Sequence, residues 1–409
     1  MEASKGSGLF HFISLRTVKL SKGDPYILFI ILCTITAIMA TFLTAMATMI
    51  IIGTLTITIT RMLKIDPAPY ILAEAIIVDV GGMTLPFSQI ANIIISQTVG
   101  LSLIFFVINI LPFVLLSFVY TIWFLFRRLK RNIGLVDPRR KMLIMEVNEW
   151  IFVPDMKVFK RSAIIFGMII VALVTIPQIF IVALIGAIVF LIASGVKTEE
   201  IFSHIDWNTL IFFTGLYVIV GAMEHKGILH EAGVALGQLT MENIFVSSIL
   251  ILWVVGVLSG LIDNVAIALS FIPIIYAMGE VSNLGPLIQI LWIAMLFGTN
   301  LGGNLFPYGS PTTILAMGLS KKHGTTFDMK TFMKLGSMWG IGNLIIATIY
   351  LAARLYAETY LSSIYFYALF YPMIFMGLIM FIIIIERINL SDIARYLKFV
   401  GEKFSRLKG

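Results

Sequence analysis

An aspartate and an asparagine stand side by side in an otherwise apolar stretch, GLIDNVAIALSFIPII at residues 260–275. A charged side chain at the centre of a membrane helix costs about 2.5–3.5 kcal/mol on insertion scales. That cost is offset where the carboxylate of Asp263 faces a polar cavity, takes up a proton or meets a cation. The pair therefore predicts an ion or proton site, with Na⁺ as a candidate and Asn264 as a neutral ligand. The alternative is a neutral or paired Asp263 that pins a chain reversal.

Two further segments carry a glycine pair followed by a proline, VGGMTLPFSQIAN at residues 80–92 and LGGNLFPYGSPTT at 301–313. Glycine pairs with a nearby proline break a helix, because proline cannot continue the hydrogen-bonding pattern. The amino end of a half-helix attracts an anion, and unwound carbonyl groups suit a small cation. Close helix packing through small residues is the alternative. The glycines concerned are Gly81, Gly82, Gly302 and Gly303.

Polar side chains surround both glycine pairs. Glu74 and Asp79 precede the first pair, where the second half has Met295 and Asn300. The hydroxyl and carboxamide groups nearby suit a small ion or an oxyanion better than an apolar molecule. Each of them alone is also of the kind that joins helices by hydrogen bonds, and Glu74 has that alternative role too. The neutral residues are Ser88, Gln89, Asn92, Asn304, Ser310, Thr312 and Thr313.

The composition is that of a multi-span helical membrane protein. Of the 409 residues 59% are hydrophobic and 12% charged, with a mean hydropathy of +1.00, whereas soluble domains carry about 25% charged residues. The net charge of +7 is explained by membrane topology and does not indicate nucleic-acid binding. One cysteine and five histidines form no disulfide and no HExxH metal motif. No nucleophile–base pair points to an enzyme, and we expect no cofactor or resident metal.

Two apolar stretches, residues 25–63 and 243–278, are too long for one crossing, which takes about 20 residues. Two half-spans that meet inside the membrane fit each stretch better than two full spans with a tight turn. Such a re-entrant hairpin needs its tip buried in protein or facing a wet cavity. The remaining pattern predicts broken helices over 68–96 and 286–319, and spans near 98–127, 162–194 (two, across Pro177), 207–226, 332–354 and 361–386.

The distribution of Lys and Arg residues predicts how these spans are oriented in the membrane. With residue 1 inside and each hairpin returning to its own side, Lys226 and Arg354 lie outside, and the other 27 of the 29 Lys and Arg residues lie inside. Cations gather in cytoplasmic loops. We therefore expect a multi-pass protein of the cell membrane whose basic loop and tail are cytoplasmic.

The two halves repeat in sequence and are predicted to be inverted. The glycine-pair segments align at an offset of 221, and Thr44 and Ala45 stand where Asp263 and Asn264 stand at an offset of 219. A shared order of matching elements indicates an internal repeat. The predicted fold is an all-α polytopic membrane protein, an inverted repeat with two re-entrant hairpins and two broken helices. Its divisions are a first repeat (1–127), a basic loop (128–161), a second repeat (162–386) and a basic tail (387–409).

These motifs resemble the ion transporter superfamily. LIDNVAIALSFIPI is similar to its hairpin motif FLDNVTT…IPI, and GTNLGGNLFPYGSPTTILAMGLSKKHG (298–324) to its second broken helix. IDWNTLIFFTGLYVIVGAMEHKGIL (205–229) and LKIDPAPYILAEAIIVDVGG (63–82) resemble two more of its helices. The superfamily includes arsenical-pump membrane components, sodium/proton antiporters, the P protein and citrate-transporter-like domains. The resemblance implies an inverted-repeat fold, a substrate and ion site between hairpin tips and broken helices, and often dimers.

The chain departs from that superfamily in two ways. Its first hairpin has Leu43-Thr44-Ala45 where the superfamily has LDN, and of the superfamily's GDPPN only the last residue, Asn92, is kept. One of two coupling sites is therefore expected to be altered. The first repeat also lacks the leading helices that 162–226 supply in the second, which predicts an upstream start, a second chain that supplies them, or function without them.

The expected function is secondary active transport of a small inorganic ion, an oxyanion or a carboxylate, of the arsenite or sodium/proton type, by alternating access. The coupling ion would be H⁺ or Na⁺, and the partners are the lipid bilayer and a second copy or helper chain. A non-transporting homologue or subunit of a larger membrane complex is the alternative, and a channel is a third class. The residue types do not separate arsenite, sodium with protons, and dicarboxylates.

Overall fold

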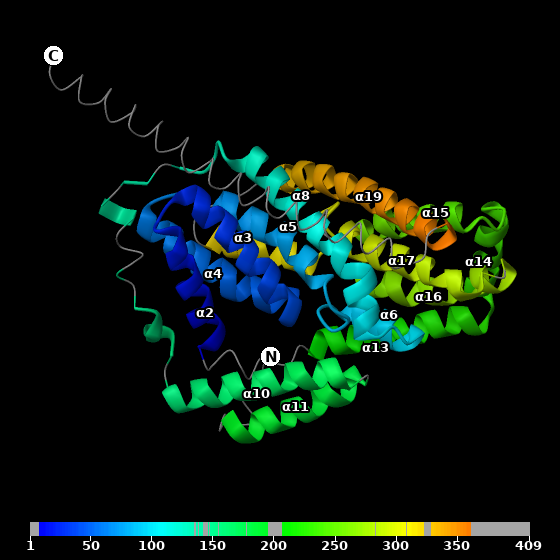
Figure 1. Ribbon diagram of the computed structural model, residues 1–409, viewed down its shortest axis with the longest axis horizontal. Coiled ribbons are helices and arrows are strands. Elements are labelled where there is room, and N and C mark those ends of the chain that lie inside the picture. Colours follow the sequence, from blue (N-terminus) through cyan, green and yellow to red (C-terminus); the bar gives the residue numbers. More distant parts are fainter. Residues whose placement is uncertain are drawn as a thin grey trace, which may run out of the picture. The chain divides into compact units, whose positions relative to one another are not determined.

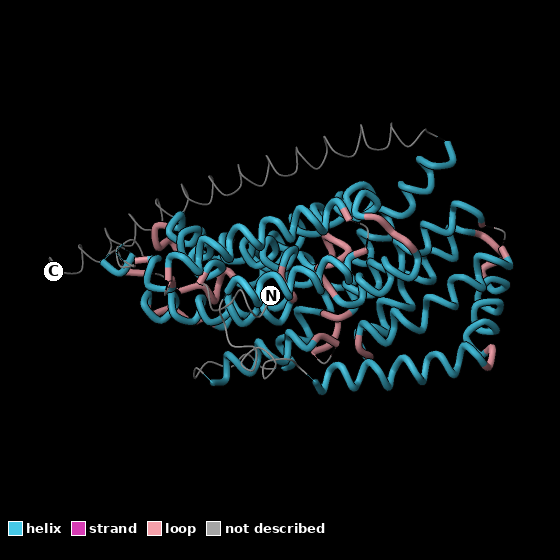
Figure 2. Tube along the Cα trace, turned by 90° about the horizontal axis from the view of Figure 1, so that it is seen from below, coloured by secondary structure: helices cyan, strands magenta, loops and turns pink. Residues whose placement is uncertain are grey.

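The computed structural model describes residues 8–134, 136–137, 139–141, 146, 148–153, 155–176, 178–194, 207–282, 284–307, 309–322 and 329–360. These residues form helices and turns, with no strand among them (Figure 2). Within these ranges seven helices are long and apolar enough to cross a membrane. The chain is therefore an all-α polytopic membrane protein, as predicted. Residues Met1–Tyr356 form one compact unit and Ala357–Gly409 a second, and the contacts described here lie in the first.

Two helical hairpins occupy the two long apolar stretches. Helices α3 (Pro25–Phe42) and α4 (Ala45–Leu63) form the first, and α15 (Ile244–Leu261) and α16 (Asn264–Val281) form the second. Each arm has 18 or 19 residues, longer than the half-spans we expected, and is long enough to cross a membrane by length and composition. The re-entrant form of the hairpins therefore stays a prediction.

Side-chain caps set where each hairpin begins. Asp24 accepts hydrogen bonds from the backbone N–H groups of Tyr26 and Ile27, at 3.0 and 3.2 Å, and Pro25 occupies the first position of α3. Asn243 caps α15 in the same way. Such caps satisfy amide groups that the first helical turn leaves without partners.

A helix is interrupted after each glycine pair, as the sequence predicts. Helix α5 (Ala68–Gly82) is followed by a turn and then α6 (Ile90–Val99). Helix α17 (Ile288–Gly302), which follows the short η4 (Gly285–Leu287), is likewise followed by a turn and then α18 (Pro311–Lys322). The segments after the breaks pack on the opposite half, since α6 contacts α16 and α18 contacts α4 and α5. The inverted relation of the two halves stays a prediction. It is supported by this packing, in which each half places its segment after the break on the other half.

Two long spans join the halves along their length. The short α7 (Leu103–Phe105) and the π-helical η2 (Phe106–Ile110) continue into α8 (Leu111–Leu129), which lies beside α19 (Met329–Tyr360) (Figure 1). Trp339 Nε1 donates to Thr121 Oγ1 at 2.8 Å, and Ser117 Oγ donates to Asn343 Oδ1 at 2.7 Å. The order of these contacts makes the two helices antiparallel.

The other helices lie around this assembly. Helix α10 (Met156–Thr175) packs on α11 (Ile179–Ser194), in the region predicted to hold two short spans, and α13 (Trp207–His225) fills the span predicted at 207–226. Helix α14 (Ile228–Leu239) packs on α16. Pro177, the predicted span 361–386 and the tail 387–409 lie outside the described residues.

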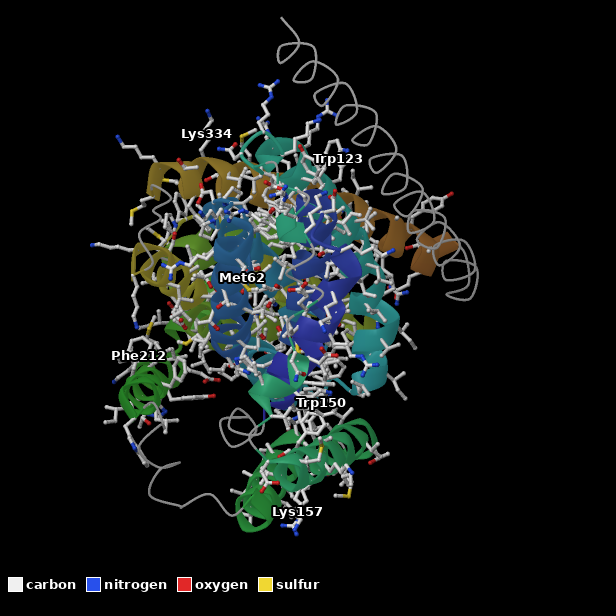
Figure 3. The ribbon with its side chains drawn as sticks, turned by 90° about the vertical axis from the view of Figure 1, so that its left-hand side faces the viewer. Met62, Trp123, Trp150, Lys157, Phe212 and Lys334 are labelled. Carbon is white, nitrogen blue, oxygen red and sulfur yellow. The ribbon has the colours of Figure 1, made fainter. Side chains whose placement is uncertain are left out.

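The amino-terminal helix docks against the basic loop. Helix α2 (Leu9–Val18) continues into η1 (Lys19–Ser21), and Phe12 stacks on Trp150 of η3 (Glu149–Phe152) with a ring-centre distance of 4.5 Å. Trp150 in turn approaches Phe159 of α10 (Figure 3). Two ion pairs, Lys19–Glu149 and Lys141–Asp24, connect the same segments.

We expect acid to loosen this docking. The hydrogen bond from Lys19 lowers the pKa of the Glu149 carboxyl. A depressed pKa means that the contribution of this pair is present above the ordinary pKa of glutamate and is lost as pH falls through the lowered value. Fluorescence of Trp150 should therefore change on acidification in wild type. In Glu149→Gln it should be changed already at neutral pH and vary less with pH; a pH response equal to that of wild type would contradict the pairing. The effect is small because the pair is only partly buried, so solvent screens its charges.

Candidate functional site

The two helix breaks meet in the protein interior. Asn300, near the end of α17, donates from Nδ2 to Asn92 Oδ1 of α6 at 2.9 Å, and both side chains are fully buried. Asn92 Nδ2 in turn donates to the carbonyl groups of Gly82 and Leu85, at 3.0 and 3.3 Å. The contact therefore connects the first break directly to the second, across 208 residues of sequence.

Asp79 supplies the carboxylate of this interior. Its side chain is 3% exposed, and Gln89 Nε2 donates to its Oδ1 at 3.3 Å. Asn304 and Ser310, both in the second break, face the same carboxylate, although its Oδ2 receives no well-aligned hydrogen bond from the described residues. Asn304 also donates to the carbonyl of Ile76 on α5, at 3.3 Å. An acid of the first half thus meets neutral polar groups of the second.

Several buried oxygens near the two breaks have no hydrogen-bond partner among the described residues: Asp79 Oδ2, Asn300 Oδ1, Asn304 Oδ1 and Thr313 Oγ1. Buried polar atoms without partners are uncommon in folded proteins. A carboxylate accompanied by carboxamide and hydroxyl oxygens is the ligand type that hard cations prefer. We call these four residues, together with Asn92, Gln89 and Ser310, the polar centre. Its groups are suited to a cation, a proton or a hydrated anion.

The tip of the second hairpin brings Asn264, and not Asp263, to the second break. The carboxamide of Asn264 lies against Gly303, where a Cβ atom would be 3.2 Å from its nitrogen, and it bonds to the Ser259 hydroxyl. Asp263 is half-buried and accepts a hydrogen bond from Val265 N at 2.8 Å, which caps α16. It makes no hydrogen bond to the polar centre within the described part of the chain. Capping is the structural role that the sequence leaves open.

The first hairpin is arranged differently at its tip. Thr44 is exposed and caps α4 through Ala47 N at 3.3 Å. A carboxamide still lies against Gly82, but it comes from Gln89 of the break, whose Nε2 would be 2.3 Å from an added Cβ. Gln89 therefore takes the place that Asn264 has in the second half, where the hairpin of the first half offers only Ala45.

The first glycine of each pair serves close packing. A Cβ atom on Gly81 would lie 2.1 Å from the carbonyl oxygen of Ala37, and one on Gly302 would lie 2.1 Å from that of Gly256. Ala37 and Gly256 are themselves related by the offset of 219. Close packing, the alternative role, therefore describes these two glycines. The first break begins after Gly82 and the second after Gly302.

Three contacts near the breaks are not predicted from the sequence. Ser88 Oγ donates to the carbonyl of Thr41 at 2.6 Å, and Ser259 Oγ donates to that of Thr299 at 2.7 Å. Thr41 also approaches the carbonyl of Gly81, at 3.4 Å. Hydroxyls of this kind bond to backbone in many membrane helices, so only the repeat offset could have singled them out. Of the remaining predicted residues, Thr312 is buried in the first turn of α18, and Glu74 bonds to Thr56 on α4, away from the breaks.

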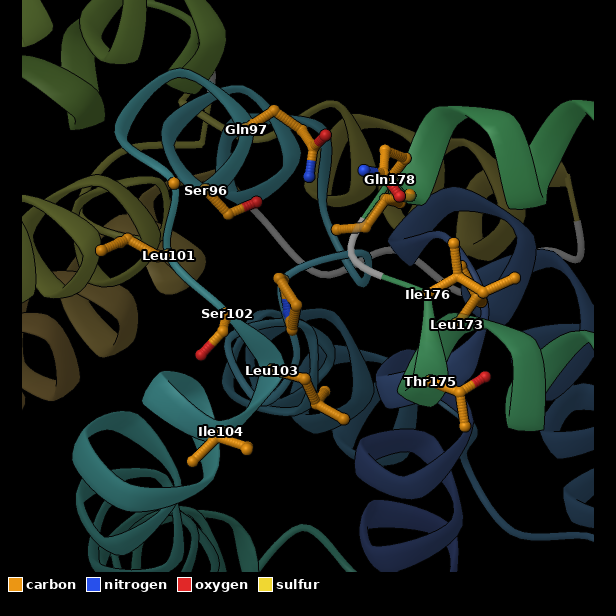
Figure 4. Close-up of a pocket in the computed structure, with 13 residues that line it drawn as sticks. Ser96, Gln97, Leu101, Ser102, Leu103, Ile104, Leu173, Thr175, Ile176 and Gln178 are labelled. Carbon is orange, nitrogen blue, oxygen red and sulfur yellow. The ribbon is translucent and has the colours of Figure 1, made fainter.

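A cavity of about 420 Å³ opens beside the first break. Pro86 of the break, Gln97 and Ser102 form one wall, and Thr175 and Gln178 of the α10–α11 connection form the other (Figure 4). A second cavity of about 370 Å³ lies across residues 99–102 and reaches Trp292 of α17. Asp79, the acidic residue of the polar centre, lines neither cavity. These cavities therefore lie next to the candidate site and do not contain it.

The contact between the two breaks can be measured. Asn92→Ala and Asn300→Ala should each lower the free energy of unfolding in detergent by about 1–3 kcal/mol, because the remaining partner is left buried and unsatisfied. The double variant should show a coupling of about 0.5–1.5 kcal/mol. A parallel cycle of Asn92 with Asn343, which bonds to Ser117 on α8, should show none. Zero coupling in both cycles would mean that the breaks do not meet.

Interrupted helices that bring polar residues together in the interior of an all-α membrane protein are typical of the class of membrane transporters. Comparison of sequences agrees, because residues 2–298 match the family described as citrate transporter. The chain belongs to this family, and the predicted membership of the ion transporter superfamily is confirmed.

Similar proteins include an uncharacterized transporter of Mycobacterium tuberculosis and a 46 kDa membrane protein of Mycobacterium leprae. Each is 27% identical over 352 residues, which cover 85% of this chain and 82% of the relative. The P protein of Homo sapiens is 23% identical over 410 residues, covering 81% of this chain and 49% of that protein.

Proposed function

We propose that the chain is a secondary active transporter of a small inorganic ion, an oxyanion or a carboxylate, with a carboxylate favoured by the family to which the chain belongs. The observation that carries the proposal is the polar centre, where Asp79 of one half faces Asn304 and Ser310 of the other. A polar site shared by two halves changes its exposure when one half moves against the other, which is the basis of alternating access.

The charges at this place favour a substrate that travels with a cation. The amino ends of α6 and α18 follow the two breaks and provide partial positive charge for an anion. Asp79 would repel that anion unless H⁺ or Na⁺ neutralised it. A cation that neutralises Asp79 would therefore favour binding of the anion beside it. Asp263 and Asn264 would complete this site from the hairpin, with Thr44, Gly81, Gly82, Gly302 and Gly303 around it.

Membrane sidedness belongs to the same proposal. Basic residues lie at the ends of two helices, Arg61 and Lys64 at the end of α4 and Arg127 and Arg128 at the end of α8. The basic loop begins at the end of α8. Cations at these positions favour the cytoplasmic side of the cell membrane for residues 128–161 and for the tail. The division into two repeats, and a second copy or a helper chain as a partner, are also part of the proposal.

The full chain in proteoliposomes tests the function. Radiolabelled citrate, a dicarboxylate and arsenite are offered under an imposed pH or sodium gradient, and the control is the same vesicles after an ionophore has collapsed the gradient. Accumulation above the outside concentration supports ion-coupled transport. Flux that only runs downhill indicates a channel. Absence of flux for every solute, and of sodium/proton exchange, supports the alternative of a non-transporting homologue or subunit.

A further inference from the structure

A second buried acid, Glu74, lies away from the polar centre. It occupies the middle of α5, and its side chain is fully buried. It lies five positions before Asp79, which corresponds to about 7.5 Å along a helix axis. One carboxylate oxygen accepts a hydrogen bond from the Thr56 hydroxyl of α4. The other has no partner among the residues that the structure describes.

Among the residues that the structure describes, no cation balances this acid. The helices packed on α5 are α3, α4, α8, α17 and α18. Their charged residues lie at helix ends: Arg61, Arg127, Arg128, Lys321 and Lys322. None of these forms an ion pair with Glu74, and the titratable group that faces it is the buried thiol of Cys33 on α3. A carboxylate with one hydrogen bond and no counter-ion is strongly disfavoured when it is buried, whereas the neutral acid is not.

A purely structural role explains only part of this arrangement. An interhelical hydrogen bond between α4 and α5 needs an acceptor for the Thr56 hydroxyl, and a glutamine would provide one without the penalty of a buried acid. What an acid adds is the ability to gain and lose a proton. The geometry points to a proton-binding site formed by Glu74 and Thr56, distinct from the polar centre, whose proton is coupled to the proposed transport in addition to the cation that balances Asp79.

The location of this site connects binding of the proton to the packing of the helices around the two breaks. It connects α5, which carries Asp79 and ends at the first break, to α4, the second arm of the first hairpin. Helix α18 packs on both of them and begins just after the second break. Loss of the proton to water would place a charge between α4 and α5. That charge requires either water or a cation to enter, so the two helices must separate.

A charge-neutral substitution tests the site, and the test rests on the proposed function only in its first part. Glu74→Gln keeps the acceptor for Thr56 and cannot bind a proton. In proteoliposomes it should equilibrate substrate but no longer accumulate it when a pH gradient is applied. Asp66→Asn is the matched control, because Asp66 is exposed, precedes the same helix and caps Ala68 N at 2.9 Å, which asparagine also does. It should behave as wild type.

Infrared difference spectroscopy of the purified protein gives a readout that needs no transport. A protonated buried carboxyl has a carbonyl stretching band that should be present in wild type and Asp66→Asn and absent in Glu74→Gln. Thr56→Val should move the band to higher frequency because its hydrogen bond is lost, and Thr56→Ser should not. If Glu74→Gln does not fold, the two Thr56 variants decide the assignment.

The possible failures are distinct. Accumulation by Glu74→Gln equal to that of wild type, or an unchanged infrared band, overturns the proton site and leaves the transporter standing. A wild-type protein that moves no solute overturns the transporter, and the infrared band still decides whether Glu74 binds a proton.

Discussion

Asp263→Asn should abolish ion-driven flux and leave the protein folded. Asparagine caps a helix as well as aspartate does, so the bond to Val265 N and the start of α16 are kept. Only the charge at the hairpin tip is lost. A contact between this charge and the coupling cation contributes about 2–5 kcal/mol when both are desolvated in the occupied site, and each 1.4 kcal/mol is a factor of ten, so we expect initial rates of gradient-driven uptake to fall about 30-fold or more.

The matched control for this variant is Asp155→Asn. Asp155 caps α10 through Lys157 N at 2.7 Å, lies on an exposed surface and has no role in the proposed site. It should transport as wild type does. If Asp263→Asn transports normally, the carboxylate serves only as a cap and the charge of the site belongs to Asp79. Asp263→Ala then separates the two roles, since loss of the cap should lower stability by about 1 kcal/mol with no further loss of flux.

Gly302→Ala should strongly destabilise the packing of α17 on α15, because the added methyl group has no room. The added carbon would lie 2.1 Å from the carbonyl oxygen of Gly256, and the obstacle is backbone, which cannot turn aside as a side chain can. Helices α15 and α17 must therefore separate. Overpacking in a well-packed core costs about 1–3 kcal/mol, and we expect about 3 kcal/mol or more here because both elements are rigid. Gly81→Ala should have a similar effect, because Ala37 presents its carbonyl at the same distance.

Thermal unfolding in detergent, followed by circular dichroism, measures this loss. Gly318→Ala in α18 is the control, since an added Cβ there meets nothing within 4 Å. It should raise stability by roughly 0.5–1 kcal/mol, because alanine favours a helix over glycine. Equal melting temperatures for Gly302→Ala and Gly318→Ala would show that the hairpin and broken helix are not in direct backbone contact.

The members of the polar centre can be predicted from residue types and positions, but their contacts with one another cannot. Asp79, Asn92, Asn304 and Ser310 are all predicted from their position around the glycine pairs, and the structure brings them together. The pairing of Asn92 with Asn300 is not predicted, since their repeat counterparts are Thr313 and Asp79. The two halves use different chemistry at equivalent positions, so an alignment of the halves cannot show which side chains meet.

The loss of Asn264's counterpart at Ala45 is a second instance. The altered motif predicts an impaired first half, yet the carboxamide of Gln89 lies against Gly82 much as that of Asn264 lies against Gly303. A side chain from the break replaces one from the hairpin, because each lies against the second glycine of its own pair. Only coordinates show such a replacement, since the two residues are not equivalent in the repeat.

By itself the sequence determined that the chain is a multi-span helical membrane protein of this superfamily, with helices broken after Gly82 and Gly302. Composition, caps and glycine–proline pairs act locally, so they can be recognised along the chain. The tertiary structure alone decided that Asp79 and not Asp263 lies within the polar centre, and that Glu74 is buried against Thr56 with no cation beside it in the described part of the chain. Burial and partnership depend on which helices pack together, and here the packing exchanges α6 and α18 between the halves.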